Sequence, residues 1–246
     1  MSADSPEELD ALHATGAVVA QTIRAMRRAV RPGITTAELD AIATREFARA
    51  GARSGPRLDY DFPGTTCISV NDEAVHGIPG KRVLRRGDLV KLDVTAELDG
   101  FYADACRTVA VGEVRPQAAR LVRTAEQALA AALKVVRTGV PLNAIGASVQ
   151  RVVHRRGFSL CDGLMGHGIG RRIHEDPEVP NVFDPALTTP LSEGLVITIE
   201  PIVAIGDPQV HVGRDGWTVR TADRSWSAHA EHTIVVREAG PVVLTA

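Results

Sequence analysis

The sequence predicts an α+β protein in which helices cover one side of a largely antiparallel sheet. Three observations lead to this fold class. Two pairs of helix patterns alternate with strand patterns along the chain. A strand, an Asp-Gly turn and a returning strand form a hairpin pattern between the helix pairs. The helix pairs also repeat each other at a constant spacing, which predicts two related halves with their helices on the same side of the sheet.

Capping signals delimit the two helices of the first half. The segment Ser5 to Glu8 is a capping box with proline at the first helical position, and its helix is expected to reach about Val30. The sequence Arg31-Pro32-Gly33 then ends it. A second capping box, from Thr35 to Glu38, begins a helix that is expected to end at Gly51.

The second half follows the same plan. Pro116 begins a helix expected to reach Thr138-Gly139, and the next is expected from about Asn143 to Arg156, closed by Gly157. Six positions recur at a constant shift of 106 residues: Arg31, Gly33, Ile34, Leu39, Arg49 and Gly51 recur as Arg137, Gly139, Val140, Ile145, Arg155 and Gly157. We therefore expect one domain over residues 1–246 with halves of about 5–113 and 114–246. The alternative is a coincidence between two amphipathic helix pairs, whose punctuation is common.

The hairpin places two aspartates close together. An apolar strand pattern ends at the turn Asp99-Gly100, and the returning strand is expected from Phe101 to Val111. A two-residue turn pairs Thr95 with Asp104, and alternation puts Asp93 on the same face as Thr95. Asp93 and Asp104 are then diagonal neighbours, roughly 7–8 Å apart at the backbone. Alternatively, both are solvated strand residues, as most aspartates are.

Three further ionisable residues accompany apolar strand-like segments. Glu200 ends one such segment, Glu231 opens another, and His167 lies in a glycine-rich run over residues 163–170. For either glutamate alone, a strand end that reaches water is the simpler explanation. Together with Asp93 and Asp104, however, they form a set that is costly to bury without compensating charge. A pair of divalent cations would compensate it and supply a hydrolytic centre, and these ligands suit Mn, Fe, Co or Zn.

Two other histidines stand in loops. His76 precedes Gly77-Ile78-Pro79-Gly80, where the backbone is expected to bend tightly. A loop histidine there can bind a substrate, although taken alone it is more simply a surface residue. His174 follows His167 by seven residues, which is not a helical ligand spacing, so the two need not serve the same metal.

Composition excludes several classes of protein. A formal net charge of −2 gives no electrostatic basis for binding nucleic acid or a membrane surface. No apolar run approaches the roughly 20 residues of a membrane span, and the acidic, polar start is unlike a signal peptide. The three cysteines are odd in number and show no CxxC spacing, which favours a reduced, cytosolic setting.

These segments together carry a family resemblance that spans nearly the whole chain. The sequences CISVNDEAVHGIPG, DLVKLDVTAELDGFYADACRTVAVG, GHGIGRRIHEDPEVPN, GLVITIEPI and SAHAEHTIVV occur in order. In this order they resemble the type I methionine aminopeptidases of the short bacterial form, which have the pita-bread metallopeptidase fold. The resemblance implies a pseudo-two-fold fold with two divalent metal ions between its halves. It also implies a monomer whose substrates are the N-termini of nascent polypeptides, with methionine followed by a small residue.

The resemblance also implies a role for each candidate residue. Asp93 would chelate one metal, Asp104 and Glu231 would bridge both, and His167 would hold the other with Glu200. A metal-activated water would attack the first peptide bond. Glu200 would also act as general base, His76 would steady the substrate or tetrahedral intermediate, and His174 would hydrogen-bond the scissile amide or its oxyanion. The matching pocket walls are Cys67, Trp217, Tyr60 and Phe62.

The sequence departs from the family pattern in that pocket. Many members have an aromatic-His-Gly-aromatic-Pro stretch before the cysteine, whereas this chain has Leu58-Asp59-Tyr60-Asp61-Phe62-Pro63 and lacks the histidine. Ile173 stands where an aromatic residue is common. Two alternatives remain open. One is an aminopeptidase P, prolidase or creatinase, which usually carry an extra N-terminal domain. The other is a non-enzymatic binding homologue, which typically loses metal ligands.

Overall fold

The computed structural model describes all 246 residues as two helix pairs, each followed by short strands. The helices are α1 (Pro6–Ala29), α2 (Thr36–Ala50), α3 (Gly55–Tyr60), α4 (Pro116–Val135) and α5 (Asn143–Arg155). Before α4 the strands are β1 (Arg53–Ser54), β2 (Cys67–Val70), β3 (Glu73–Val75), β4 (Leu89–Leu98) and β5 (Phe101–Ala110). After α5 they are β6 (Ser159–Leu160), β7 (Gly166–Gly168), β8 (Glu175–Val179), β9 (Val196–Ile199), β10 (Ile202–Ala204), β11 (Val210–Val212), β12 (Val219–Thr221), β13 (Ser227–His229), β14 (His232–Val235) and β15 (Val242–Val243).

The capping signals place the helix starts correctly. The Glu8 N–H donates to the Ser5 hydroxyl, and Thr35 and Glu38 form the reciprocal capping box at the start of α2. Gly51 ends α2 in the left-handed region at φ 71°, where glycine carries no steric penalty. The expected reach of α4 to Thr138-Gly139 is wrong. Val136 is already extended, and its buried side chain belongs to the core beneath α4 and α5.

The β4–β5 hairpin has the predicted turn and register. Asp99 and Gly100 form the turn with positive φ angles of 50° and 85°, and Thr95 pairs with Asp104. All the strand pairs are antiparallel, and the strands form four hydrogen-bonded groups. The expected antiparallel sheet is therefore present, but as a segmented layer whose groups are joined by isolated backbone contacts, such as the Arg107–Ala230 bridge and the hydrogen bond from the Glu231 N–H to the Cys106 carbonyl.

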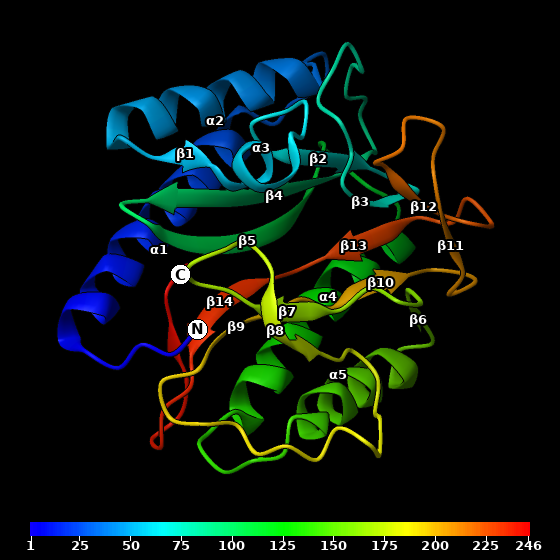
Figure 1. Ribbon diagram of the computed structural model, residues 1–246. Helices are drawn as coiled ribbons and strands as arrows, with labels where there is room; N and C mark the ends of the chain where they lie inside the picture. The colour runs from blue at the N-terminus through cyan, green and yellow to red at the C-terminus, as the bar shows by residue number, and fades with distance from the viewer.

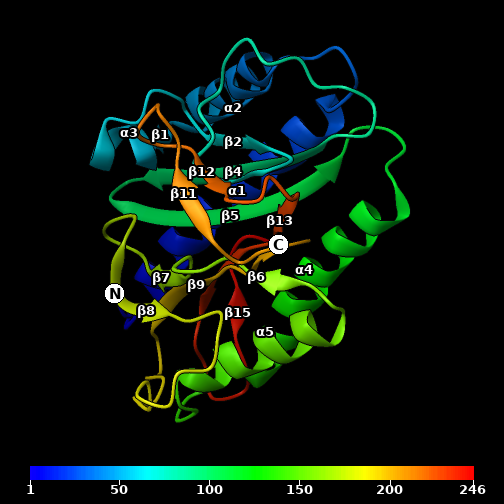
Figure 2. The same ribbon diagram turned by 90° about the vertical axis from the view of Figure 1, so that its right-hand side faces the viewer.

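The helices lie outside the strands: α1 and α2 cover the strands of the first half, with α1 behind β4 and β5 in Figure 1, and α4 and α5 cover those of the second half. In Figure 1, α2 lies beyond β4 at the top, α4 and α5 lie at the bottom, and the strands run between them. Figure 2 shows the same arrangement from the side, with β5 facing the strands that α4 covers. Each helix pair has its own apolar core, of 17 buried residues around α1 and α2 and 23 around α4 and α5. The strand faces turned away from both cores meet in the middle of the molecule.

Asp40 connects α2 to the loop that leads into β2. Its buried carboxylate accepts hydrogen bonds from the Thr65 and Thr66 backbone N–H groups and from the Thr66 hydroxyl, at 2.8–3.1 Å. Asp40→Ala is expected to cost about 3 kcal/mol of unfolding free energy, because several buried donors lose their acceptor. Urea unfolding checks this, with exposed Asp10→Ala on α1 as the matched control. Equal midpoints for the two variants would contradict it.

Candidate metal centre and substrate pocket

A cavity of about 390 Å³ opens between the two helix-covered cores. This volume is within the range of small-ligand sites in proteins. The cavity brings together all the residues that the sequence singled out: Tyr60, Phe62, Cys67, His76, Asp93, Asp104, His167, His174, Glu200, Trp217 and Glu231. Residues from both halves of the chain therefore line one pocket.

Neighbouring strands place the four carboxylates. Asp93 on β4 pairs with Cys106, and Asp104 on β5 pairs with Thr95, so the two aspartates are diagonal neighbours, as predicted. Glu200 directly follows β9 and Glu231 directly precedes β14. Ile199 of β9 pairs with His232 of β14, and continuing this antiparallel register by one residue places Glu200 opposite Glu231.

The His167 imidazole leaves one nitrogen free toward the carboxylates. Its Nδ1 lies 2.9 Å from the Gly168 carbonyl oxygen, which can only accept, so the proton is on Nδ1. Its Nε2 lies 3.5 Å from Glu200 Oε1. Potential ligand atoms of Asp104, His167 and Glu231 all lie within 4.8 Å of one another. A histidine whose other nitrogen donates to a backbone carbonyl is typical of metal ligands.

Burial makes the carboxylate cluster unfavourable when it is fully ionised. Desolvation raises the pKa of Asp104 to about 6, despite a hydrogen bond that the Thr95 hydroxyl donates at 2.7 Å. Desolvation and then the charge of Asp104 raise the pKa of Asp93, Glu200 and Glu231 well above the usual carboxyl range. Asp104 Oδ1 is buried without any hydrogen-bond partner. Closely packed carboxylates with an orphaned oxygen and a free imidazole nitrogen suit divalent cations.

The sequence analysis missed His229, which also lines this cavity. His229 is 2% exposed, and neither ring nitrogen has a hydrogen-bond partner. Its Nε2 lies 3.6 Å from one carboxylate oxygen of Glu200 and of Glu231. Burial lowers the pKa of His229 to about 3. The available signal was strand alternation, because His229 stands two residues before Glu231 and therefore faces the same way.

His229→Ala is expected to lower the affinity for divalent cations about tenfold, because groups that orient metal ligands typically contribute 10- to 100-fold. Calorimetric titration of metal-free protein with Mn²⁺ measures the change. His211→Ala is the matched control, since His211 is exposed on β11 and does not line the cavity. Unchanged Mn²⁺ affinity in His229→Ala would show that the imidazole does not support the ligands.

Apolar side chains form the wall of the pocket beside the carboxylates. Phe62 and Trp217 pack edge to face with ring centroids 5.2 Å apart, and buried Cys67 lies in the strand next to Asp93. His76 stands at the mouth in the left-handed region at φ 57°. His174 also lies at the mouth, and its ring centroid is 4.2 Å from that of His167. An apolar pocket therefore adjoins a carboxylate–histidine cluster.

Comparisons with known proteins place the chain in a family. The pattern of metallopeptidase family M24 matches residues 10–238. The chain belongs to this family. A relative named methionine aminopeptidase, from Staphylococcus epidermidis, is 42% identical over 100% of this chain and 98% of its own length. The crystal structure of a methionine aminopeptidase from Rickettsia prowazekii superimposes with a TM-score of 0.96 at 34% identity, covering 100% of both chains.

Membership of family M24 confirms a metal-dependent peptidase, and the full-length relatives and structures named methionine aminopeptidase confirm the resemblance and the fold class. The structure also resembles the prolidase from Pyrococcus furiosus, with a TM-score of 0.80 at 22% identity. That likeness covers 98% of this chain and 64% of the prolidase, and at this identity it shows the fold alone. An M24 metallopeptidase binds divalent metal ions, for which the Asp104, His167 and Glu231 cluster is a candidate site. None of the helices has the length and apolar character needed to cross a lipid bilayer.

Proposed function

We propose that this chain is a methionine aminopeptidase that removes the initiator methionine from the N-termini of new polypeptides. One observation carries the proposal: a cluster of four carboxylates and a free imidazole nitrogen borders an apolar pocket in one cavity. The near full-length similarity to proteins named methionine aminopeptidase supports the choice of substrate. We expect a small second residue in the substrate, as the family resemblance implies.

We propose that two divalent cations occupy the cluster. Asp93 would hold one cation, His167 and Glu200 would hold the other, and Asp104 and Glu231 would serve both. The raised carboxyl pKa values and the orphaned Asp104 Oδ1 support this set, since two double charges balance four carboxylates. Co, Mn, Fe and Zn all suit such ligands. Bound cations would lower the pKa of water and polarise the scissile carbonyl.

Three of the chain's own side chains would complete the chemistry. Glu200 would take up the proton of the attacking water, because its carboxylate lies within the cluster beside the site of attack. His76 steadies the substrate or the tetrahedral intermediate from the mouth of the pocket. His174 donates a hydrogen bond to the scissile amide or its oxyanion, which stabilises developing charge.

The apolar wall would hold the methionine side chain. Phe62, Trp217 and Cys67 present an edge-to-face aromatic pair and a thiol beside the cluster, and Tyr60 closes the outer side. A flexible thioether adapts to such a wall and makes favourable contacts with aromatic rings. The first peptide bond then lies next to the carboxylates, which places cleavage after one residue.

We further infer that the chain is one domain of two related halves, about 5–113 and 114–246, with the site between them. The separate apolar cores of α1–α2 and of α4–α5 support this organisation. A monomer in the cytosol that binds neither nucleic acid nor membrane fits a peptidase acting on new polypeptides. The three free, buried cysteines agree with a reducing compartment.

Hydrolysis of a Met-Gly-Xaa peptide by metal-stripped protein tests the proposal, with Mn²⁺, Fe²⁺, Co²⁺ or Zn²⁺ added back. Matched peptides beginning with Leu, Ala or Xaa-Pro are assayed in parallel. We expect metal-dependent release of methionine alone. Release of another residue would support a metal-dependent peptidase but overturn the methionine specificity. Asp59, Tyr60 and Ile173 would then be the first residues to examine. Metal binding without any hydrolysis would indicate a non-enzymatic homologue.

A further inference from the structure

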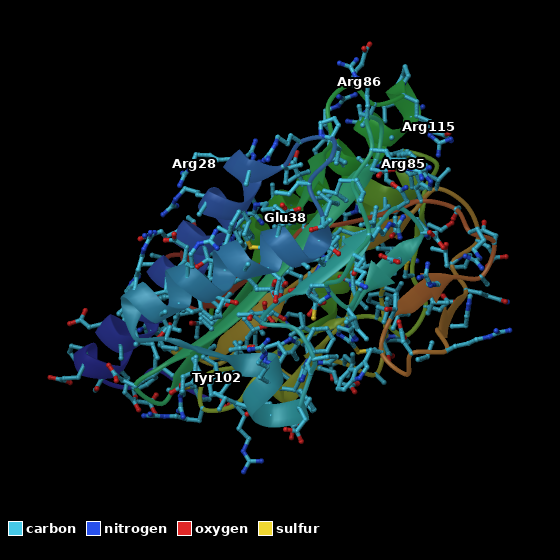
Figure 3. All side chains as sticks on the ribbon, turned by 90° about the horizontal axis from the view of Figure 1, so that it is seen from above. Arg28, Glu38, Arg85, Arg86, Tyr102 and Arg115 are labelled. Carbon is cyan, nitrogen blue, oxygen red and sulfur yellow. The ribbon has the colours of Figure 1, made fainter.

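The short helix α3 is hydrogen-bonded to the loop that carries His174. Asp59 Oδ2 accepts a hydrogen bond of 3.1 Å from the Ile173 backbone N–H, and Asp59 Oδ1 accepts one of 2.9 Å from the Tyr102 hydroxyl on β5. Figure 3 shows Tyr102 beside α3. Ile173 and Tyr102 are both buried. One carboxylate therefore fixes α3 against both the hairpin and the residue that precedes His174.

This arrangement brings the Tyr60 hydroxyl to the His174 ring. Tyr60 Oη lies 2.6 Å from His174 Nδ1, and no other side-chain partner of that hydroxyl is present. A separation of 2.6 Å is typical of an O–H donor and is shorter than the usual range for an N–H donor. The hydroxyl therefore donates and Nδ1 accepts. An imidazole that accepts at Nδ1 carries its proton on Nε2.

The His174 ring borders the cavity that holds the carboxylate cluster. Tyr60 and His174 both line the cavity, and the His174 ring lies against that of His167. With Nδ1 occupied by Tyr60, Nε2 is the nitrogen left for the substrate. An Nε2–H group is a donor, which is what a scissile carbonyl or its oxyanion requires. Without a hydrogen-bond partner on Nδ1, the ring would exchange between its two neutral tautomers. Only one of these tautomers has a proton on Nε2 to donate.

We propose that Tyr60 is a positioning residue that holds His174 in the tautomer with its proton on Nε2, with Asp59 holding α3 in place for this contact. The proposal rests on the proposed function insofar as it assigns the Nε2–H group to the scissile peptide bond. The state of the ring itself does not depend on that assignment. Asp59, Tyr60 and Ile173 are the positions where the sequence departs from the family pattern or adjoins that departure; here Asp59 bonds the Ile173 N–H, and the neighbouring Tyr60 bonds His174.

Tyr60→Phe tests this inference, and Tyr102→Phe is its matched control. These are the only two tyrosines in the chain, and each substitution removes one hydroxyl. Tyr102 bonds Asp59 but does not contact His174. The first measurement is the ¹⁵N–¹H correlation spectrum of histidine-labelled, metal-free protein at about pH 8, above the usual histidine pKa of about 6.5. His174→Gln identifies the His174 signals by their loss.

We expect the His174 signals of the natural protein and of Tyr102→Phe to show a protonated Nε2 and an unprotonated Nδ1. In Tyr60→Phe, both nitrogens should move toward averaged positions. The kcat for Met-Gly-Xaa should fall about tenfold in Tyr60→Phe at nearly unchanged KM, since the donor acts mainly on developing charge. Tyr102→Phe should keep kcat within about twofold, because Tyr60 keeps its bond to His174 and Asp59 still accepts a hydrogen bond from the Ile173 backbone N–H.

Two outcomes would overturn the inference. One is a proton on His174 Nδ1 in the natural protein, and the other is a Tyr60→Phe spectrum identical to that of the natural protein. Both can be observed without any peptidase activity. If the natural protein instead shows the expected tautomer but releases no methionine with any metal, the proposed function fails while the Tyr60–His174 assignment stands.

Discussion

Asp104→Asn is expected to abolish metal-dependent release of methionine, with a loss of at least about 10³-fold in kcat/KM. Asp104 lies at the centre of the cluster, where its ligand atom is within 4.8 Å of those of His167 and Glu231. An amide keeps the volume and can still accept from Thr95, but it carries no charge and cannot bridge two cations. The loss should therefore appear in Mn²⁺ affinity as well as in catalysis, which calorimetry and steady-state kinetics measure separately.

Asp99→Asn is the matched control for this variant, because it makes the same chemical change on the same hairpin. Asp99 is exposed in the turn at φ 50°, a conformation that asparagine tolerates. It should leave kcat/KM and Mn²⁺ affinity unchanged. The metal-free Asp104→Asn protein should unfold at a higher temperature than the natural metal-free protein, because one buried charge is gone. If Asp104→Asn keeps more than about a tenth of the activity of the natural protein, Asp104 is not a metal ligand.

Local signals in the sequence were sufficient for the hairpin and the helix starts. Asp99-Gly100 selects a two-residue turn, and that turn alone determines which residues pair, so the diagonal placement of Asp93 and Asp104 followed without tertiary information. The end of α4 was different. Its last turn depends on burying Val136 in a core made from distant segments, and no capping residue marks that position.

The residues of the candidate site also differ in whether the local sequence could predict them. The five proposed metal ligands stand in recognisable strand-like segments, so the sequence could name them. His229 differs because its significance comes only from lying within 3.6 Å of Glu200 and Glu231. The contact of Tyr60 with His174 joins residues 114 positions apart, and Tyr60 lies in the stretch that departs from the family pattern. Contacts between distant segments of this kind have no local sequence signal.

The metal-free protein is expected to lose stability as the pH rises from about 6.5 to about 8. Burial raises the pKa of Asp93, Glu200 and Glu231 well above the usual carboxyl range. The folded state therefore binds more protons than the unfolded state, and stability falls as these groups ionise. Bound divalent cations compensate the ionised carboxylates. Added Mn²⁺ should thus raise the unfolding temperature and reverse or flatten this slope.

Other titrating groups define the useful pH window. Burial lowers the pKa of His167 and His229 to about 3, so these groups add stability as the pH rises toward 6.5. Below pH 6.5 the histidines raise the stability as the pH increases, whereas the carboxylates lower it. Desolvation lowers the pKa of Lys91 to about 8, so above this pH a further group adds stability. Between these limits the buried carboxylates dominate the change.

Glu231→Gln tests whether this pH dependence arises from the carboxylate cluster or from other groups in the protein. Glu231 is 1% exposed, and the charges of Asp104 and Glu200 raise its pKa in addition to burial. Removing its charge lowers the repulsion on its neighbours, so the metal-free variant should show a smaller loss of unfolding temperature between pH 6.5 and about 8 than the natural protein does. Its response to Mn²⁺ should also fall. An equal loss of unfolding temperature in both metal-free proteins would show that the pH dependence arises outside the carboxylate cluster. The electrostatic argument for a two-cation site would then fail.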